Sequence, residues 1–318
     1  MCKMMNTIEK IPVVAVVGPT ASGKSRLAVE IALRQNGEII SADSMQIYQG
    51  MSIGTAKPSK EEMRGVPHHL IDFADISQPF SVAEYVARAA ECIVKLSARG
   101  KLPVIVGGTG LYIRSLLNNI QFTEDDRDAS LRLALEEKAA RQGTETLLAE
   151  LKSFDPDSAV RIHPNNTGRI IRAIEIYRTT GITMTEQMKR SKIYPSPYDA
   201  CVIGLGFQNR QKLYERINRR VDEMMDKGLL LEAEEVLKRP NSQTALQAIG
   251  YKELLPYFQG ECTLAQAVEK IKQESRRYAK RQLTWFRRDE NVHWIMVDEA
   301  SDFDAVTEEA MRIINLKG

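Results

Sequence analysis

Short apolar runs alternate with amphipathic stretches in the first third of the chain, and apolar runs return after residue 200. The apolar runs have the length of buried strands and lie at residues 13–17, 39–42, 104–106, 201–206 and 294–297. Helical patterns lie between the early runs, at residues 25–34, 82–96 and 111–117. This alternation predicts an α/β fold whose parallel sheet is covered by helices on both faces. In such sheets, ligands bind beyond the carboxyl ends of the strands.

The segment 119–198 interrupts the alternation because it is charged and mostly helical in pattern. Its helical stretches lie at 128–142, 147–151 and 168–178. We therefore predict a helical insertion domain at 119–198, within an α/β core formed by residues 1–118 and 199–318. The alternative is that these helices simply pack on the sheet. Downstream, the pattern predicts helices over 213–237, broken near Gly228, and over 264–286.

Composition excludes several classes of protein. The 318 residues carry a net charge of +2, so nucleic-acid binding would need a local basic patch. The four cysteines, Cys2, Cys92, Cys201 and Cys262, lack metal-ligand or redox spacing, which favours reduced thiols and a cytoplasmic location. No stretch approaches the roughly 20 apolar residues of a membrane span, and residues 1–10 lack a signal-peptide core. We expect no membrane association.

A glycine-rich loop follows the first apolar run and precedes a helical pattern. It fits the phosphate-binding pattern Gly-four-Gly-Lys-Ser/Thr and comprises Gly18, Pro19, Thr20, Ala21, Ser22, Gly23, Lys24 and Ser25. Such a loop binds phosphate through backbone amides and the positive end of the following helix, so we expect all eight residues to contact a diphosphate or polyphosphate. Lys24 adds a positive charge, and the Ser25 hydroxyl is a candidate Mg²⁺ ligand. The pattern indicates a polyphosphate but does not say which one.

Two further polar motifs follow the next two predicted strands. Asp43 has three interpretations: it holds Mg²⁺ through water, it is a general base, or it is a turn residue that caps a helix. The neighbouring Met45, Gln46 and Tyr48 suit contact with a planar heterocycle better than contact with phosphate. The loop 107–110 offers amides and the Thr109 hydroxyl to the same phosphates, although it is also typical of a plain strand-to-helix turn.

Two arginine-rich segments are ambiguous on their own. In the segment 276–288, Arg276, Lys280 and Arg287 lie close together on a helix, which indicates either a solvated face or a surface that binds a phosphate backbone. Arg220 either neutralises a leaving phosphate or forms ordinary ion pairs. The pair His68–His69 indicates a structural role rather than a metal site, since no third ligand has suitable spacing.

Taken together, these motifs resemble the bacterial tRNA dimethylallyltransferases, also called isopentenyl transferases, over nearly the whole chain. The matching segments are GPTASGKS (18–25), DSMQIY (43–48), GTAKP (54–58), PHHLID (67–72), GGTGLY (107–112), RIIRAIE (169–175) and KRQLTWFR (280–287). Ser25 stands where threonine is common in that family, and either residue supplies the hydroxyl.

The resemblance implies transfer of a dimethylallyl group from dimethylallyl diphosphate to N6 of the adenosine that follows the anticodon, in tRNAs reading codons that begin with U. It also implies that the insertion holds the anticodon stem-loop, that Mg²⁺ assists, and that Asp43, Thr109 and Arg220 are catalytic. The tRNA contacts that we expect are Asp43, Ser44, Met45, Gln46, Thr109, Arg132, Arg169, Arg172, Gly250, Tyr251, Lys252, Arg276, Lys280, Arg281, Gln282, Trp285 and Arg287.

Three alternatives stay open at this point. A small-molecule kinase like adenylate kinase would use the same phosphate loop, but the large insertion and the basic C-terminal helix argue against it. A nucleotide-dependent RNA-binding switch would not need Asp43 at the mouth of the site. A prenyltransferase acting on free AMP or ATP would not need the segments that we expect to hold tRNA. We expect a monomer, because no feature indicates a self-complementary interface.

Overall fold

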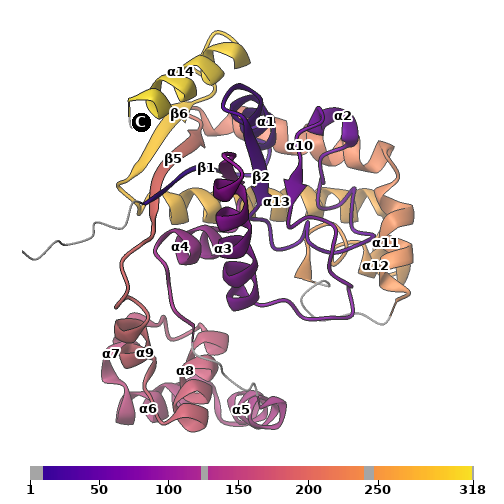
Figure 1. Cartoon of the computed structure of the whole chain (residues 1–318). Coiled ribbons are helices and arrows are strands. Elements are labelled where there is room, and N and C mark those ends of the chain that lie inside the picture. Colours follow the sequence, from indigo (N-terminus) through magenta and orange to yellow (C-terminus); the bar gives the residue numbers. More distant parts are fainter. Residues whose placement is uncertain (1–9, 123–127, 240–246, 317–318) are drawn as a thin grey trace, which may run out of the picture. The chain divides into compact units, whose positions relative to one another are not determined.

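A computed structural model describes residues 10–122, 128–239 and 247–316 of the chain (Figure 1). Its centre is a six-stranded sheet in the order β3-β2-β4-β1-β5-β6, with every neighbouring pair parallel. The strands are β1 (Ile11–Val17), β2 (Gly37–Ser41), β3 (His68–His69), β4 (Leu102–Val106), β5 (Tyr198–Gly206) and β6 (Val292–Met296). The predicted parallel α/β fold is confirmed.

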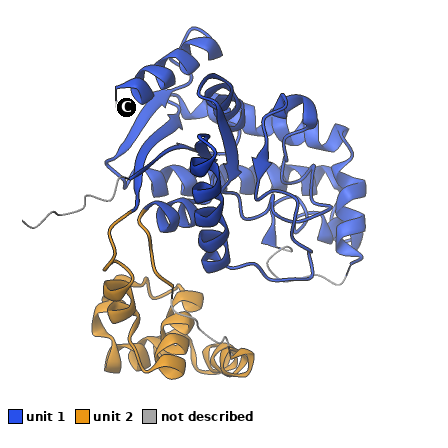
Figure 2. Cartoon of the chain, in the orientation of Figure 1, with its two compact units in different colours: residues 1–117, 197–318 blue, residues 118–196 orange. Residues whose placement is uncertain are grey.

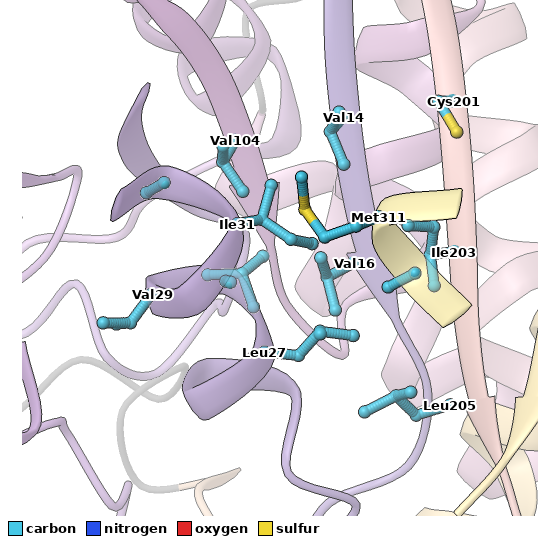
Figure 3. Packing of buried hydrophobic residues seen from close by; sticks show 14 of the residues in the cluster. Val14, Val16, Leu27, Val29, Ile31, Val104, Cys201, Ile203, Leu205 and Met311 are labelled. Carbon is cyan, nitrogen blue, oxygen red and sulfur yellow. The ribbon is translucent and has the colours of Figure 1, made fainter. Parts of the chain in front are cut away.

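Side chains of β1 alternate between the two faces of the sheet, as the strand period requires. Val14 and Val16 face a core built with α1 (Lys24–Arg34) and α14 (Phe303–Asn315) (Figure 3). Val13, Ala15 and Val17 face a second core, built with α3 (Val82–Ala98) and α4 (Gly110–Leu117). The strand is buried on both sides, which explains why its sequence is a continuous apolar run.

The helices that follow β5 form a third core with the segment after β2. They are α10 (Arg210–Asp226), α11 (Leu229–Leu237), α12 (Leu255–Phe258) and α13 (Leu264–Phe286). Gly228, with φ of 98°, separates α10 from α11, as the sequence predicts. Ile47, Met51 and Ile76 from the early part of the chain pack into this core. The polar segment that begins at Asp43 is thereby anchored to the C-terminal helices.

Residues 118–196 form a compact unit separate from the unit of residues 1–117 and 197–318 (Figure 2). Its helices are α5 (Ala129–Gln142), α6 (Thr144–Phe154), α7 (Pro156–Arg161), α8 (Thr167–Thr180) and α9 (Met184–Arg190). They enclose a core of their own, in which Leu147, Leu151 and Ile174 are fully buried. The Asp155 carboxylate caps α7 through Ser158 N and also binds Thr185, so it joins two helices of this unit.

Several elements lie outside what the hydrophobic pattern predicts. Strand β3 has two residues, too few for a period-two signal. Helices α2 (Lys60–Met63), α7 and α9 are one or two turns long, while α14 is a full amphipathic helix that we did not predict. None of the described helices combines the length and the apolar character needed to cross a bilayer. Cys92, Cys201 and Cys262 form no disulfide among the described residues, and Cys2 lies outside them.

Candidate functional site

Three loops meet at the carboxyl ends of the neighbouring strands β2, β4 and β1. The phosphate loop joins β1 to α1, and both of its glycines have a positive φ, 138° at Gly18 and 97° at Gly23. A Cβ atom at Gly18 would lie 2.5 Å from the Leu205 carbonyl oxygen of β5. Glycine is therefore required both for the backbone conformation and for the close approach of β5.

Lys24 begins α1 and lies between two cavities, both of which it lines. Its Nζ donates a hydrogen bond of 2.6 Å to the Pro19 carbonyl oxygen. Burial of the ammonium group, reinforced by the nearby Arg220, lowers the pKa of Lys24 to about 7. An anion bound beside Lys24 would stabilise the protonated ammonium group, so this site is suited to binding an anion.

Asp43 follows β2 and closes a turn with its own side chain. Its Oδ1 accepts hydrogen bonds from the amides of Met45 at 2.9 Å and Gln46 at 3.3 Å. The interpretation of Asp43 as a turn residue is confirmed, but residues 44–47 form a turn and not a helix, so Asp43 is not a helix cap. Oδ2 takes no part in these two hydrogen bonds. The turn therefore fixes the orientation of the carboxylate and is compatible with a role of Asp43 as a base. Asp43 lines a cavity of about 280 Å³ together with Ser44, Met45 and Gln46.

The second glycine loop is fixed to the ends of both β1 and β2. Gly107 N donates to the Val16 carbonyl oxygen, and Thr109 N donates to that of Ala42, each at 3.3 Å. The Thr109 Oγ1 accepts a hydrogen bond of 3.1 Å from Ser44 N. Thr109 and the Asp43 segment are therefore held side by side, as the predicted convergence of strand ends requires.

Arg220 belongs to α10 and lines the same cavity as the phosphate-loop residues Thr20, Lys24 and Ser25. Burial lowers the pKa of its guanidinium group, and the nearby carboxylates of Asp43 and Glu62 oppose that shift. The cavity of about 280 Å³ adjoins a wider one of about 1050 Å³, because Lys24, Ser25 and Arg220 line both. The two predicted phosphate-binding cations and the predicted base thus surround one space.

Helix α13 contributes inward-facing and outward-facing residues. Lys280, Arg281 and Arg287 are exposed, whereas Arg276 binds Glu269 at 3.0 Å and Asn218 at 2.7 Å. Gln282 is buried, with 4% exposure, and Trp285 packs against Gly110. The helix is therefore not a purely solvated face, because its inner side meets both glycine loops.

Tyr278 of α13 also lines the smaller cavity, although its spacing places it with the apolar residues Leu283 and Phe286. Burial and the neighbouring Asp43 raise the pKa of its hydroxyl, and the nearby side chains of Thr109 and Gln282 oppose that shift. The phenol is therefore neutral at physiological pH. Periodicity predicts that this side of α13 faces the protein interior, and at Tyr278 the interior is the smaller cavity.

The three residues of the segment 250–252, which we expect to contact tRNA, have different environments in the structure. Gly250 lines the smaller cavity and Lys252 is exposed, but Tyr251 is fully buried. The Tyr251 hydroxyl donates to Glu232 Oε1 at 2.7 Å. Glu232, which we did not predict, also accepts hydrogen bonds of 2.8–2.9 Å from the amides of residues 52–54. It anchors the GTAKP segment that lines both cavities.

In the helical unit, the arginines expected to bind tRNA differ in their surroundings. Arg132 and Arg172 both pair with the Glu175 carboxylate, at 3.2 and 3.6 Å. Arg169 is exposed in the first turn of α8. The shared carboxylate holds two guanidinium groups together on the surface of this unit.

Comparison with known proteins identifies the family. The sequence model of the IPP transferase family matches residues 46–289 of the chain. The chain belongs to the IPP transferase family. The tRNA dimethylallyltransferase of Bacillus subtilis strain 168 is 51% identical over 302 residues, which cover 95% of each chain.

Solved structures of IPP transferases agree with this assignment. The tRNA isopentenylpyrophosphate transferase of Bacillus halodurans is 44% identical and covers 97% of this chain and 98% of its own, with a TM-score of 0.71. A eukaryotic dimethylallyltransferase acting on tRNA is 29% identical, with a TM-score of 0.82, and the match covers 96% of this chain and 78% of that one. The predicted resemblance is confirmed.

Proposed function

We propose that this chain transfers a dimethylallyl group from dimethylallyl diphosphate to N6 of the adenosine on the 3′ side of the anticodon, in tRNAs that read codons beginning with U. The observation that carries the proposal is the single cavity lined by Lys24, Asp43 and Arg220. Relatives named tRNA dimethylallyltransferase match almost the whole chain and support it. A kinase would need the same phosphate loop but no carboxylate aimed at an acceptor amine.

The diphosphate of the donor would bind at residues 18–25. Loop amides and the amino end of α1 attract phosphate oxygens, and Lys24 and Arg220 supply two positive charges. The carbon–oxygen bond of an allylic diphosphate breaks more easily when the charge left on the oxygen is neutralised. The loop therefore holds the leaving group rather than the group that is transferred.

A Mg²⁺ ion fits the oxygen-rich chemistry of this site. Ser25 offers a hydroxyl at the start of α1, and Asp43 lines the same cavity. Among the described residues no group of three His, Cys, Asp or Glu is placed to hold a metal, so most ligands would be phosphate oxygens and water, as is usual for Mg²⁺. When bound, the ion would neutralise part of the diphosphate charge.

Asp43 would act as the base. The N6 lone pair attacks C1 of the dimethylallyl group, the C1–O bond breaks, and diphosphate leaves with the bonding electrons. The Asp43 carboxylate accepts the proton that N6 loses. Because an exocyclic amine conjugated to a purine is a poor nucleophile, the base must lie within hydrogen-bond reach. Thr109 would contact a phosphate beside the base.

The acceptor adenine can reach the cavity only when it is flipped out of the anticodon loop, which costs a few kcal/mol. We propose that the exposed residues Lys280, Arg281 and Arg287 of α13 and the arginines of the helical unit bind the tRNA backbone. The helical unit of residues 118–196 would act as the insertion domain that holds the anticodon stem-loop, and the enzyme would work as a monomer.

One experiment tests this function against its rivals. The protein is incubated with Mg²⁺, radiolabelled dimethylallyl diphosphate and unmodified tRNA carrying the target adenosine. We expect label in the RNA, at N6 after nuclease digestion, and no label in free AMP or ATP. Labelled ATP with AMP in a parallel reaction tests the kinase. A folded protein that labels no RNA would contradict the proposal.

A further inference from the structure

We infer that Gln282 is a positioning residue that fixes the phosphate loop against the second glycine loop. The inference rests on the proposed function, since it assigns the diphosphate to residues 18–25. It also departs from our expectation that Gln282 contacts tRNA. With 4% exposure, its side chain lies inside the protein, between two loops from different strands.

Both ends of the Gln282 carboxamide are occupied by backbone groups. Its Oε1 accepts a hydrogen bond of 2.8 Å from Thr20 N in the phosphate loop. Its Nε2 donates a hydrogen bond of 3.1 Å to the Gly108 carbonyl oxygen in the second glycine loop. One planar group therefore joins the loop after β1 to the loop after β4 and ties both to α13.

The Gln282 carboxamide complements this pair of partners. The site presents one donor and one acceptor, and a carboxamide offers the complement of both on one planar group. A carboxylate at this position cannot donate to the Gly108 carbonyl, and an aliphatic side chain leaves both buried groups unpaired. Asparagine is one methylene shorter and cannot span the same gap from α13.

Glycines in the second loop allow α13 to pack closely against it, because they carry no side chain. A Cβ atom at Gly108 would lie 1.9 Å from Nε2 of Gln282, and one at Gly110 would lie 2.1 Å from Cδ1 of Trp285. Gln282 and Trp285 are three residues apart, so they occupy the same face of the helix. This face lies directly on the loop that presents Thr109, and it sets the distance between that loop and the phosphate loop.

Loss of this link should affect the diphosphate more than the tRNA. The link restrains Thr20 and Gly108 on the phosphate side of the site, whereas Lys280 and Arg287 of α13 are exposed and line neither cavity. A loop that is free to shift loses preorganised amides, and binding must then supply the cost of ordering them. The exposed Lys280 and Arg287, which we propose to bind tRNA, do not depend on this link.

The test compares Gln282→Glu with Gln273→Glu, the same substitution on the same helix. Gln273 accepts a hydrogen bond from Lys270 and lines neither cavity, so it controls for the substitution itself; because Gln282 lines the smaller cavity, the uncharged variant below controls for charge added there. Calorimetry measures binding of inorganic pyrophosphate with Mg²⁺, and filter binding measures the affinity for tRNA. We expect Gln282→Glu to weaken pyrophosphate binding about 10- to 100-fold and to change tRNA affinity less than about twofold. Gln273→Glu should change neither.

A second variant, Gln282→Leu, removes both hydrogen bonds without adding charge and should give the same pattern. Weakened tRNA binding with normal pyrophosphate binding would overturn the inference and make Gln282 a tRNA contact. Unchanged pyrophosphate binding in both variants, or loss of the folded state in both, would also reject a positioning role. Pyrophosphate binding does not depend on prenyl transfer, so an inactive wild-type enzyme would contradict the proposed function and leave this inference standing.

Discussion

Replacement of Asp43 by asparagine separates the base from the turn that holds it. In the structure Oδ1 accepts both hydrogen bonds of the turn, from the amides of Met45 and Gln46. An asparagine Oδ1 can accept the same two bonds, so Asp43→Asn should keep the turn while removing the basic oxygen. Asp43→Ala removes both, and loses about 1 kcal/mol of stability in addition, as a lost cap does.

The expected loss of rate for Asp43→Asn is about 10²–10⁴-fold, the range for a lost general base, or about 3–5 kcal/mol in the barrier. The structure also predicts how the loss divides between kcat and KM. The Asp43 charge lies close enough to Lys24 and Arg220 to stabilise their charged forms, so it also opposes an incoming diphosphate. Its removal should therefore leave the KM for the donor unchanged or lower, and the loss should appear in kcat.

Single-turnover transfer of radiolabelled dimethylallyl groups to tRNA measures the chemical step directly. The matched control is Asp75→Asn, because Asp75 also caps a turn through Oδ1, at 2.8 Å from Ser77 N, but is exposed and lines neither cavity. A rate for Asp43→Asn within tenfold of wild type would refute the base assignment. A defect seen only in KM would instead make Asp43 a substrate-binding residue.

Other predictions concern the surroundings of the site. Glu232→Ala leaves three loop amides and a buried hydroxyl without their acceptor. It should lower the free energy of unfolding, measured in urea, by about 2–4 kcal/mol. The control Glu235→Ala, at an exposed position of α11, should change that free energy by less than about 0.5 kcal/mol. Replacing Lys280 and Arg287 by alanine should weaken tRNA binding and reduce its salt slope by about one per lost phosphate contact; an unchanged slope would return this part of α13 to a solvated face. Burial raises the pKa of the Glu38 carboxyl, but hydrogen bonds from the side chains at 69 and 99 outweigh it and hold the pKa below 4.5, so the stability from this group is present above that pH and is lost as the pH falls. Thermal unfolding from pH 6 to 3 should show a smaller loss for Glu38→Gln than for wild type.

Local sequence patterns predict the elements that present the site. Strands β1, β2 and β4 are apolar runs, and each is followed by a polar motif, so the meeting of the loops at one sheet edge follows from parallel pairing alone. The long helix α13 is predicted at its observed bounds, 264–286, by the spacing of its apolar residues. These features depend on residues close together in sequence.

The sequence does not predict what depends on contacts between distant segments. Gln282 meets Thr20 and Gly108 across 262 and 174 residues, and only the packing of α13 brings them together. Glu232 acts on backbone amides, which have no signature in the sequence of their loop. Tyr278 shares the inner side of α13 with Leu283 and Phe286, and periodicity identifies that side but not whether it meets a core or a cavity.

The charges of the site explain how a phosphate loop can serve the breaking of a carbon–oxygen bond. Lys24 and Arg220 line the smaller cavity with one carboxylate, Asp43, so this cavity is electropositive. Burial, and after it the nearby Arg220, lowers the pKa of Lys24 to about 7. An allylic diphosphate ester bears less negative charge than the diphosphate that departs, and the additional charge develops on the bridging oxygen as the bond to carbon lengthens. The enclosed cations therefore attract the transition state more strongly than the bound donor, which is the condition for lowering the barrier rather than only tightening binding. The same arrangement should bind inorganic pyrophosphate more tightly than the donor, so pyrophosphate is expected to inhibit in competition with dimethylallyl diphosphate, with an inhibition constant below the donor's KM.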